Sequence, residues 1–144
     1  LHDLMLACAM LGIDIHYAIP EGYEPANDVV ERSTDLAKKN GSKVMVTNDP
    51  VEAVTGADVV YTDVFISMGE EHMKDKIKSF DGFQVNEKLV GNMNDEWKFM
   101  HCLPAKRGKE VTSDVLDGKN SVVLQQAKNR MYIQQAILLY VLKK

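Results

Sequence analysis

Short apolar runs alternate along this chain with longer stretches in which apolar positions recur every three to four residues. The apolar runs are rich in β-branched and aromatic residues and stop near proline, asparagine or aspartate, as is typical of strands. They predict strands over residues 13–19, 44–47, 58–62 and 96–100. The amphipathic stretches predict helices over residues 1–11, 27–40, 50–55, 70–80 and 86–90.

The C-terminal third of the chain has a different pattern. Residues 105–120 predict a loop with a short helical piece over 113–116, and residues 121–123 predict a brief extended segment. A last helix is expected over residues 126–142, and its apolar end, residues 136–142, is predicted to be buried.

The alternation of strands and helices predicts right-handed βαβ units around a parallel sheet. No internal repeat, low-complexity tract or long linker divides the chain. We therefore expect one domain of the α/β class.

Composition and charge narrow the class of protein. The 144 residues are 45% hydrophobic and 26% charged, as in an ordinary soluble domain with a core of its own. The net charge of −4, without a basic cluster, argues against nucleic acid or an anionic membrane surface as a partner. No apolar run reaches the roughly 20 residues that span a bilayer.

The cysteines indicate the redox compartment of the protein, and the first residue indicates whether the chain is part of a longer one. Cys8 and Cys102 do not make a disulfide framework, so we expect a cytoplasmic protein. Leu1 is not an initiator methionine, and we expect the chain to begin inside a larger protein.

Parallel sheets carry their chemistry at the carboxyl ends of the strands, so the residues that follow each predicted strand are the candidates for a site. Asp63 follows the third strand, and Ser67 lies four residues later. Asp63 could bind a substrate amine with the help of Ser67. It could equally cap a turn in which Gly69 supplies backbone freedom.

The fourth strand runs into His101 and Cys102, and Pro104 ends the extended run. A cysteine beside a histidine could be a nucleophile or a metal ligand. Adjacent strand residues point to opposite faces, however, which argues against a Cys–His dyad. No further ligands follow at zinc spacing, so no metal is expected. Arg130, at the start of the last helix, could hold a phosphate or carboxylate with its planar fork of donors, or face solvent.

Motifs of nucleotide binding are absent. No Gly-x-Gly occurs, so the dinucleotide fingerprint and the Walker A loop are missing, and there is no Gly-x-Ser-x-Gly elbow. This argues against a nicotinamide-binding domain, and no cofactor is expected.

Several stretches, taken together and in order, resemble the C-terminal, ornithine-binding domain of the ornithine carbamoyltransferase family. They are Gly22-Tyr23-Glu24-Pro25, Thr47-Asn48-Asp49-Pro50, Asp63-Val64-Phe65 with Ser67-Met68-Gly69-Glu70, His101-Cys102-Leu103-Pro104-Ala105 and Gln126-Ala127-Lys128-Asn129-Arg130. The resemblance covers essentially the whole chain. The Ser-Met-Gly and Cys-Leu-Pro stretches distinguish it from aspartate carbamoyltransferases, and Ser-Met-Gly distinguishes it from putrescine carbamoyltransferases.

The resemblance implies a three-layer α/β sandwich with a mostly parallel, Rossmann-like sheet flanked by helices, whose first, central strand is missing from this chain. Residues 1–144 are then the ornithine-binding domain, and the N-terminal domain, with its Ser-Thr-Arg-Thr phosphate loop and His-Pro-x-x-Gln segment, is absent. The isolated chain is therefore expected to be inactive. The full-length enzyme is expected to be a cytoplasmic homotrimer, or a multiple of trimers, in arginine metabolism (biosynthesis, degradation or the urea cycle).

The reaction implied by the resemblance joins carbamoyl phosphate and L-ornithine to give L-citrulline and phosphate, without a cofactor or a metal. The resemblance implies that Asp63 accepts hydrogen bonds from the ornithine α-ammonium. It implies that Ser67 and Met68 belong to a mobile loop that closes over the substrate.

The resemblance also assigns roles at the end of the fourth strand. Cys102 would lie beside the δ-amine and the carbamoyl group, and the Leu103 carbonyl would accept a hydrogen bond from the attacking nitrogen. The bond between Leu103 and Pro104 would be cis. Arg130 would bind the carbamoyl oxygen or the phosphate, so Cys102 and Arg130 are the expected catalytic residues.

The chain departs from the family pattern at two positions, and two alternative functions remain. Phe65 stands where tryptophan is commoner, and Lys128 stands where glutamate usually precedes Asn-Arg. The chain could belong to a carbamoyltransferase for a related amine, such as N-acetylornithine or putrescine. Asp63 argues against the acetylated amine, because acetylation removes the ammonium that the carboxylate should hold. The second alternative is a catalytically inert carbamoyltransferase-like domain that binds a metabolite or a partner chain.

Overall fold

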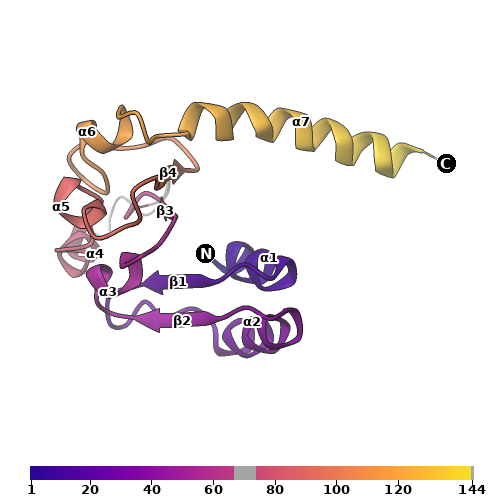
Figure 1. Cartoon of the computed structure of the whole chain (residues 1–144), viewed down its shortest axis with the longest axis horizontal. Helices are drawn as coiled ribbons and strands as arrows, with labels where there is room; N and C mark the ends of the chain where they lie inside the picture. The colour runs from indigo at the N-terminus through magenta and orange to yellow at the C-terminus, as the bar shows by residue number, and fades with distance from the viewer. Residues whose placement is uncertain (67–73, 144) are drawn as a thin grey trace.

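The computed structural model describes residues 1–66 and 74–143, and it confirms the predicted alternation of strands and helices (Figure 1). The strands are β1 (Ile15–Ala18), β2 (Val44–Thr47), β3 (Val59–Thr62) and β4 (Lys98–His101). The helices are α1 (His2–Leu11), α2 (Asn27–Asn40), α3 (Pro50–Val54), α4 (Lys74–Ser79), α5 (Glu87–Val90), α6 (Ser113–Leu116) and α7 (Val123–Leu142).

Some boundaries differ from those the pattern predicted. β1 is shorter than the predicted strand over 13–19, and α7 begins at Val123, before the predicted residue 126. The described part of the predicted helix over 70–80 is α4, and residues 67–73 lie outside the described residues. Within the described ranges, no helix combines the length and the apolar character needed to cross a bilayer.

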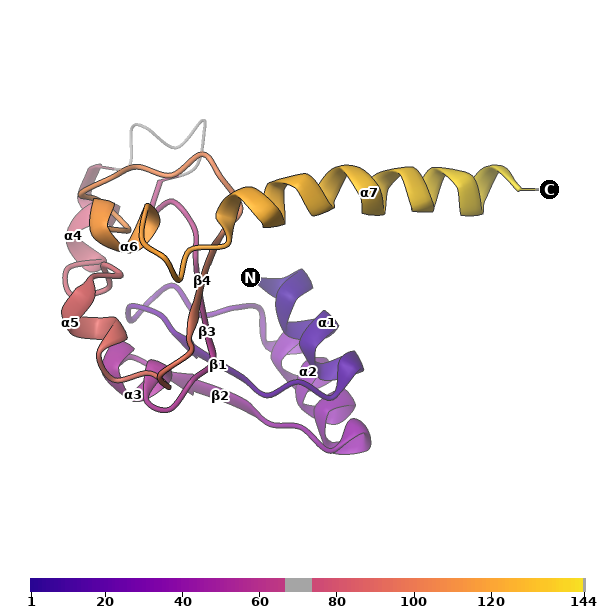
Figure 2. The same ribbon diagram turned by 45° about the horizontal axis from the view of Figure 1, so that its top comes forward.

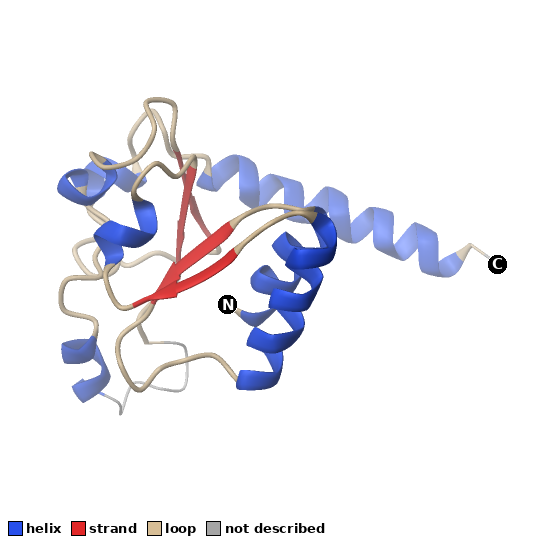
Figure 3. Cartoon of the chain, turned by 60° about the horizontal axis from the view of Figure 1, so that its bottom comes forward, coloured by secondary structure: helices blue, strands red, loops and turns tan. Residues whose placement is uncertain are grey.

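The four strands form two parallel pairs (Figure 3). β1 pairs with β2, with Ile15 opposite Val44, and β3 pairs with β4, with Val59 opposite Lys98. Parallel pairing through intervening helices confirms the predicted βαβ connection. No strand among the described residues joins the two pairs.

The outer edge of β4 is covered by the segment that leads into α7. The Phe99 amide donates to the Asn120 carbonyl at 2.9 Å, and the Val122 amide donates to the Phe99 carbonyl at 3.0 Å. Ser121 therefore pairs in parallel with Phe99. This confirms only the first residue of the extended segment predicted over 121–123, because Val122 has ψ 18° and Val123 begins α7. This pairing brings the first turn of α7 to the carboxyl end of the strand.

Each strand pair has its own apolar cluster. Around β1 the buried members are Met5, Ile15, Tyr17 and Ile19, with α1 and α2 side by side next to them (Figures 1 and 2). The cluster around β3 and β4 contains Phe99, which is fully buried. Side chains alternate along β4, so Phe99 and His101 are buried while Lys98 is exposed.

α7 projects away from the rest of the molecule, and this corrects the prediction that residues 136–142 are buried (Figures 1 and 2). Val123 is the buried residue of this helix, whereas Leu138 is 60% exposed and Tyr140 is 82% exposed. An apolar run has the same composition whether it is buried within its own domain or against another one. In the described part of this chain nothing packs over residues 136–142, and they are exposed.

Candidate active site at the ends of β3 and β4

The ends of β3 and β4 bring a carboxylate and a thiol together. Thr62 lies opposite His101 in the parallel register, so the next residues, Asp63 and Cys102, leave the strands side by side. The Cys102 thiol donates to Asp63 Oδ1, with 2.9 Å between Sγ and the oxygen. The same carboxylate oxygen accepts the Val64 amide at 2.7 Å. Asp63 is exposed and Cys102 is half-buried, so both groups can be reached from solvent.

The surroundings of Cys102 disfavour its thiolate. Burial raises the pKa of the Cys102 thiol, and the hydrogen bond and negative charge of Asp63 raise this pKa further. A hydrogen bond with Tyr61 acts in the opposite direction but does not reverse the shift. Because the thiolate is the nucleophilic form of cysteine, the site favours Cys102 as a hydrogen-bonding group over Cys102 as a nucleophile.

Alkylation by iodoacetamide at pH 8 should therefore be slower at Cys102 than at an unhindered cysteine in a peptide, and Asp63→Asn should accelerate it. Below the thiol pKa the rate follows the thiolate fraction, and removing the carboxylate charge lowers that pKa. Peptide mass mapping can follow both cysteines of the chain at once. Cys8 is the internal control, because burial alone raises its pKa and its rate should not respond to Asp63→Asn. An unchanged Cys102 rate in that variant would contradict this prediction.

The first turns of α7 are bonded to the end of β4. Gln126 Oε1 accepts the His101 amide at 3.0 Å, and Gln126 Nε2 donates to the Tyr61 hydroxyl at 3.3 Å. Arg130 lies one helical turn further along the same face, and its Nη1 donates to the Cys102 carbonyl at 3.5 Å. The structure thus brings Arg130, as predicted, to the strand end that carries Asp63 and Cys102.

Leu103 has an unusual backbone conformation beside this group. Its φ is 58°, in the left-handed region that side chains other than glycine rarely adopt, and its bond to Pro104 is cis, as expected. The Leu103 amide donates to His101 Nδ1 at 2.8 Å. Cys102 follows the last residue of β4, and its Sγ lies within 4.8 Å of a ring nitrogen of His101, so the prediction that strand geometry separates the pair is not confirmed. The thiol is hydrogen-bonded to Asp63 and not to the buried imidazole.

Three donor atoms at this end of the sheet lie close enough to hold a metal ion together: those of Asp63, His101 and Cys102, all within 4.8 Å of one another. The histidine ring does not fit that role. Its Nδ1 accepts the Leu103 amide, and its Nε2 faces the buried carboxylate of Glu110 at 3.4 Å. Coordination by His101 would require one of these contacts to break, so the histidine does not fit a metal site formed with Asp63 and Cys102.

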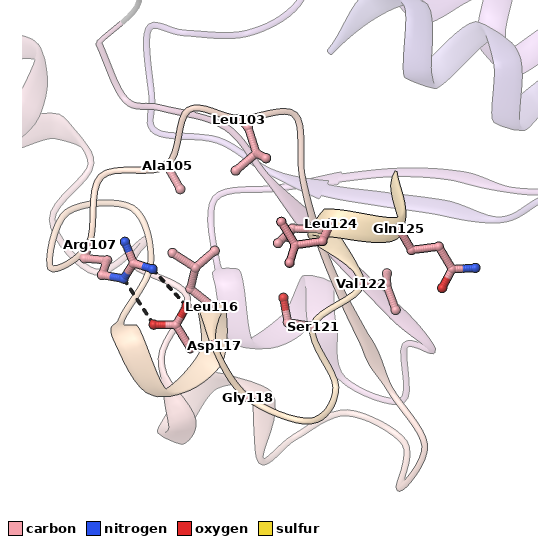
Figure 4. Close-up of a pocket in the computed structure, with 11 residues that line it drawn as sticks. Leu103, Ala105, Arg107, Leu116, Asp117, Gly118, Ser121, Val122, Leu124 and Gln125 are labelled. Carbon is pink, nitrogen blue, oxygen red and sulfur yellow. Dashed lines mark hydrogen bonds and ion pairs between the residues drawn. The ribbon is translucent and has the colours of Figure 1, made fainter. Parts of the chain in front are cut away.

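A groove of about 490 Å³ opens next to Leu103 (Figure 4). Leu103 and Ala105 lie on one side of it and Ser121 and Leu124 on another. Arg107 and Asp117 form a two-point ion pair at its rim, with contacts of 2.8 and 3.1 Å. The lining contains none of the expected polar site residues, so the groove is separate from the Asp63–Cys102 pair.

The sequence pattern and the structure differ in which residues they bring to the site. Of the predicted residues, Asp63, Cys102, Leu103 and Arg130 lie at the same strand end, whereas Ser67 and Met68 lie outside the described residues. The pattern assigned no role to Tyr61, Glu110 or Gln126. Gln126 is the first residue of the Gln-Ala-Lys-Asn-Arg stretch that resembles the family, and this was the one indication in the sequence that it could belong to the site. Glu110 sits in a loop without periodicity, and no local pattern could have pointed to its burial.

Comparison with known proteins gives a consistent set of relatives. The family model described as aspartate/ornithine carbamoyltransferase, Asp/Orn binding domain, matches residues 1–141. A catabolic ornithine carbamoyltransferase of Thermoplasma acidophilum is 51% identical over 95% of this chain and 45% of the relative. The ornithine carbamoyltransferase of Bacillus subtilis is 46% identical over 99% of this chain and 45% of the relative.

Solved structures agree with the relatives. The structure of ornithine carbamoyltransferase from Pyrococcus furiosus matches with a TM-score of 0.91 and 48% identity, over 95% of this chain and 44% of that chain. The chain therefore spans less than half the length of the proteins that it matches.

Proposed function

This chain belongs to the aspartate/ornithine carbamoyltransferase family, as its Asp/Orn-binding domain, and we propose that it supplies the ornithine-binding half of an ornithine carbamoyltransferase. Its fold is the Rossmann-like α/β fold of these structural neighbours. The observation that carries the proposal is the convergence of Asp63, Cys102 and Arg130 at one strand end, with Leu103 beside them. This arrangement offers an anion for an ammonium group and a fork of donors for an oxyanion or a phosphate.

The proposal includes the rest of the protein. Residues 1–144 form the ornithine-binding domain, and a second domain outside this chain binds carbamoyl phosphate and completes the site. The second domain would also cover the exposed apolar surface of α7, since exposed apolar surface of this extent marks an interaction face. The complete enzyme would be a homotrimer, or a multiple of trimers, in the cytoplasm, and it would need neither nucleic acid nor a membrane as a partner.

The proposed reaction is an acyl transfer between two small molecules. The neutral δ-amine of L-ornithine attacks the carbonyl carbon of carbamoyl phosphate. A carbon–nitrogen bond forms, the carbon–oxygen bond to phosphate breaks, and the attacking nitrogen loses one proton, which the departing phosphate takes up. L-citrulline and phosphate are the products, and the carbonyl oxygen carries negative charge in the tetrahedral intermediate.

The described residues divide this work between binding and orientation. Asp63 would accept hydrogen bonds from the ornithine α-ammonium, while the Leu103 carbonyl would accept one from the attacking δ-amine. Cys102 would lie beside the amine and the carbamoyl group. Arg130 would donate to the carbamoyl oxygen or the phosphate, where charge develops. Ser67 and Met68 are proposed to close over the amino acid, as the family resemblance implies.

The test is a panel of amines offered to the complete protein together with carbamoyl phosphate. Citrulline should form from L-ornithine with the highest kcat/KM, and N-acetylornithine should not react, because it lacks the ammonium that Asp63 binds. The isolated 144-residue chain should produce no citrulline. A preference for putrescine or N-acetylornithine would assign the protein to a related amine. Inactivity of the complete protein with every amine would support an inert binding domain, and citrulline from the isolated chain would contradict the division between two domains.

A further inference from the structure

Glu110 is a fully buried carboxylate for which the proposed reaction has no use. It lies between β4 and α6, and its Oε1 accepts the Lys106 amide in a short hydrogen bond. The same oxygen lies 3.4 Å from His101 Nε2, and both side chains are buried. Among the described residues, His101 Nε2 and Glu110 Oε2 have no hydrogen-bond partner, and the approach of Oε1 is the polar contact that the structure gives Nε2.

The hydrogen bonds of His101 determine where its ring carries a proton. Nδ1 accepts the Leu103 amide at 2.8 Å, which excludes a proton on Nδ1. The ring proton of His101 must therefore sit on Nε2, the nitrogen that faces Glu110. The tautomer of a histidine depends on what each ring nitrogen faces. Here Nε2 faces Glu110 Oε1 at 3.4 Å, a charge contact and not a hydrogen bond, while Nδ1 accepts the Leu103 amide.

Leu103 depends on that free Nδ1. A left-handed backbone at a residue other than glycine persists only where its surroundings hold it. The Leu103 amide donates to His101 Nδ1, two residues earlier in the chain. After Pro104, the Lys106 amide donates to Glu110 Oε1 and fixes the backbone there. Both contacts converge on one oxygen of Glu110, directly at Lys106 and through the imidazole at Leu103.

We propose that Glu110 is a positioning residue, whose buried carboxylate fixes the Nε2–H tautomer of His101 and thereby orients the Leu103 carbonyl toward the attacking amine. The residue touches no substrate and acts through His101 and the backbone of residues 103–106. The proposal rests on the proposed function for the role of the Leu103 carbonyl, whereas the tautomer of His101 can be measured without turnover.

The test compares Glu110→Gln with Glu110→Met in the complete protein. Glutamine keeps an oxygen acceptor for the Lys106 amide and for His101 Nε2–H, and methionine has a similar length without such an acceptor. With the methionine variant, kcat should fall roughly 10- to 100-fold, as a misplaced orienting group predicts, while KM for carbamoyl phosphate changes by less than about threefold. The glutamine variant should retain kcat within about threefold of the parent.

Nitrogen-15 NMR of histidine-labelled protein gives the second measurement, with the His101 signals identified by their loss in His101→Gln. The parent and Glu110→Gln should show His101 protonated on Nε2 alone, and Glu110→Met should show a mixture of tautomers. Thr112→Val is the matched control, because it removes another buried, unpartnered oxygen two residues away and should change neither kcat nor the tautomer.

Several outcomes would overturn the proposal. One is a parent protein in which His101 carries its proton on Nδ1, and this measurement stands even if both variants fail to fold. Another is Glu110→Met with an unchanged tautomer, and a third is Glu110→Gln with a loss of kcat equal to that of Glu110→Met. If the parent shows the Nε2–H tautomer but makes no citrulline, the proposed function fails while the assignment of the tautomer stands.

Discussion

Replacing Asp63 with asparagine in the complete enzyme should lower kcat/KM for L-ornithine about 30-fold. A charge-assisted hydrogen bond to an ammonium contributes about 2 kcal/mol, and asparagine keeps the shape of the side chain but not its charge. The loss should appear mainly in KM for ornithine, because the α-ammonium is bound in the same way before and during the reaction. KM for carbamoyl phosphate should stay close to that of the parent. Steady-state kinetics with each substrate varied in turn measures both quantities.

The chain offers a matched control for this substitution. Asp49 is the second residue after β2, whereas Asp63 is the first after β3, and Asp49 Oδ1 accepts the Val51 amide at 2.8 Å and caps α3. Asparagine caps helices as well as aspartate does, so Asp49→Asn should leave both KM values and kcat unchanged. A ratio of kcat/KM between Asp63→Asn and the parent that stays within threefold would contradict the assignment of Asp63 to the α-ammonium.

Phe99→Ala should cost about 3–5 kcal/mol of the free energy of unfolding, which is a large share of the 5–15 kcal/mol typical of a domain. The Phe99 side chain is fully buried in the cluster around β3 and β4, and its removal leaves a cavity within that cluster. Trp97, the only tryptophan in the sequence, packs against the same cluster and reports its unfolding by fluorescence. Urea unfolding of parent and variant, followed through Trp97, gives the difference.

Phe83→Ala is the control, since it deletes the same atoms from a half-buried ring. Its cost should be no more than about half that of Phe99→Ala, in proportion to the smaller area that leaves the core. Equal costs for the two variants would show that burial in this cluster does not determine the stability of the domain.

The local pattern of the sequence predicted what depends on near neighbours in the chain. Two-residue alternation located the strands and gave Phe99 and His101 the same, buried face of β4. The positions after the strands identified Asp63 and Cys102, because parallel strands end at a common edge. Their meeting at 2.9 Å follows from the register of β3 and β4, which the pattern implied but could not measure.

What the pattern could not predict depends on groups far apart in sequence. Glu110 has the sequence context of an ordinary loop residue, and its burial against His101 and the Lys106 amide is not visible in the local pattern. Gln126 contacts both His101 and Tyr61, which belong to different strands. The apolar end of α7 was expected in a core, because an apolar run has the same composition whether its cover comes from the same domain or from elsewhere.

The attachment of α7 has a consequence for how activity and assembly are linked. Gln126 and Arg130 bond the first turns of the helix to the end of β4, while the apolar side chains of the later turns are exposed. If a second domain covers these side chains, as proposed, the way it docks would also set the direction of α7. That direction would affect the distance between the Arg130 guanidinium and the Cys102 carbonyl. Incorrect docking would then displace Arg130 as well as leave apolar surface exposed.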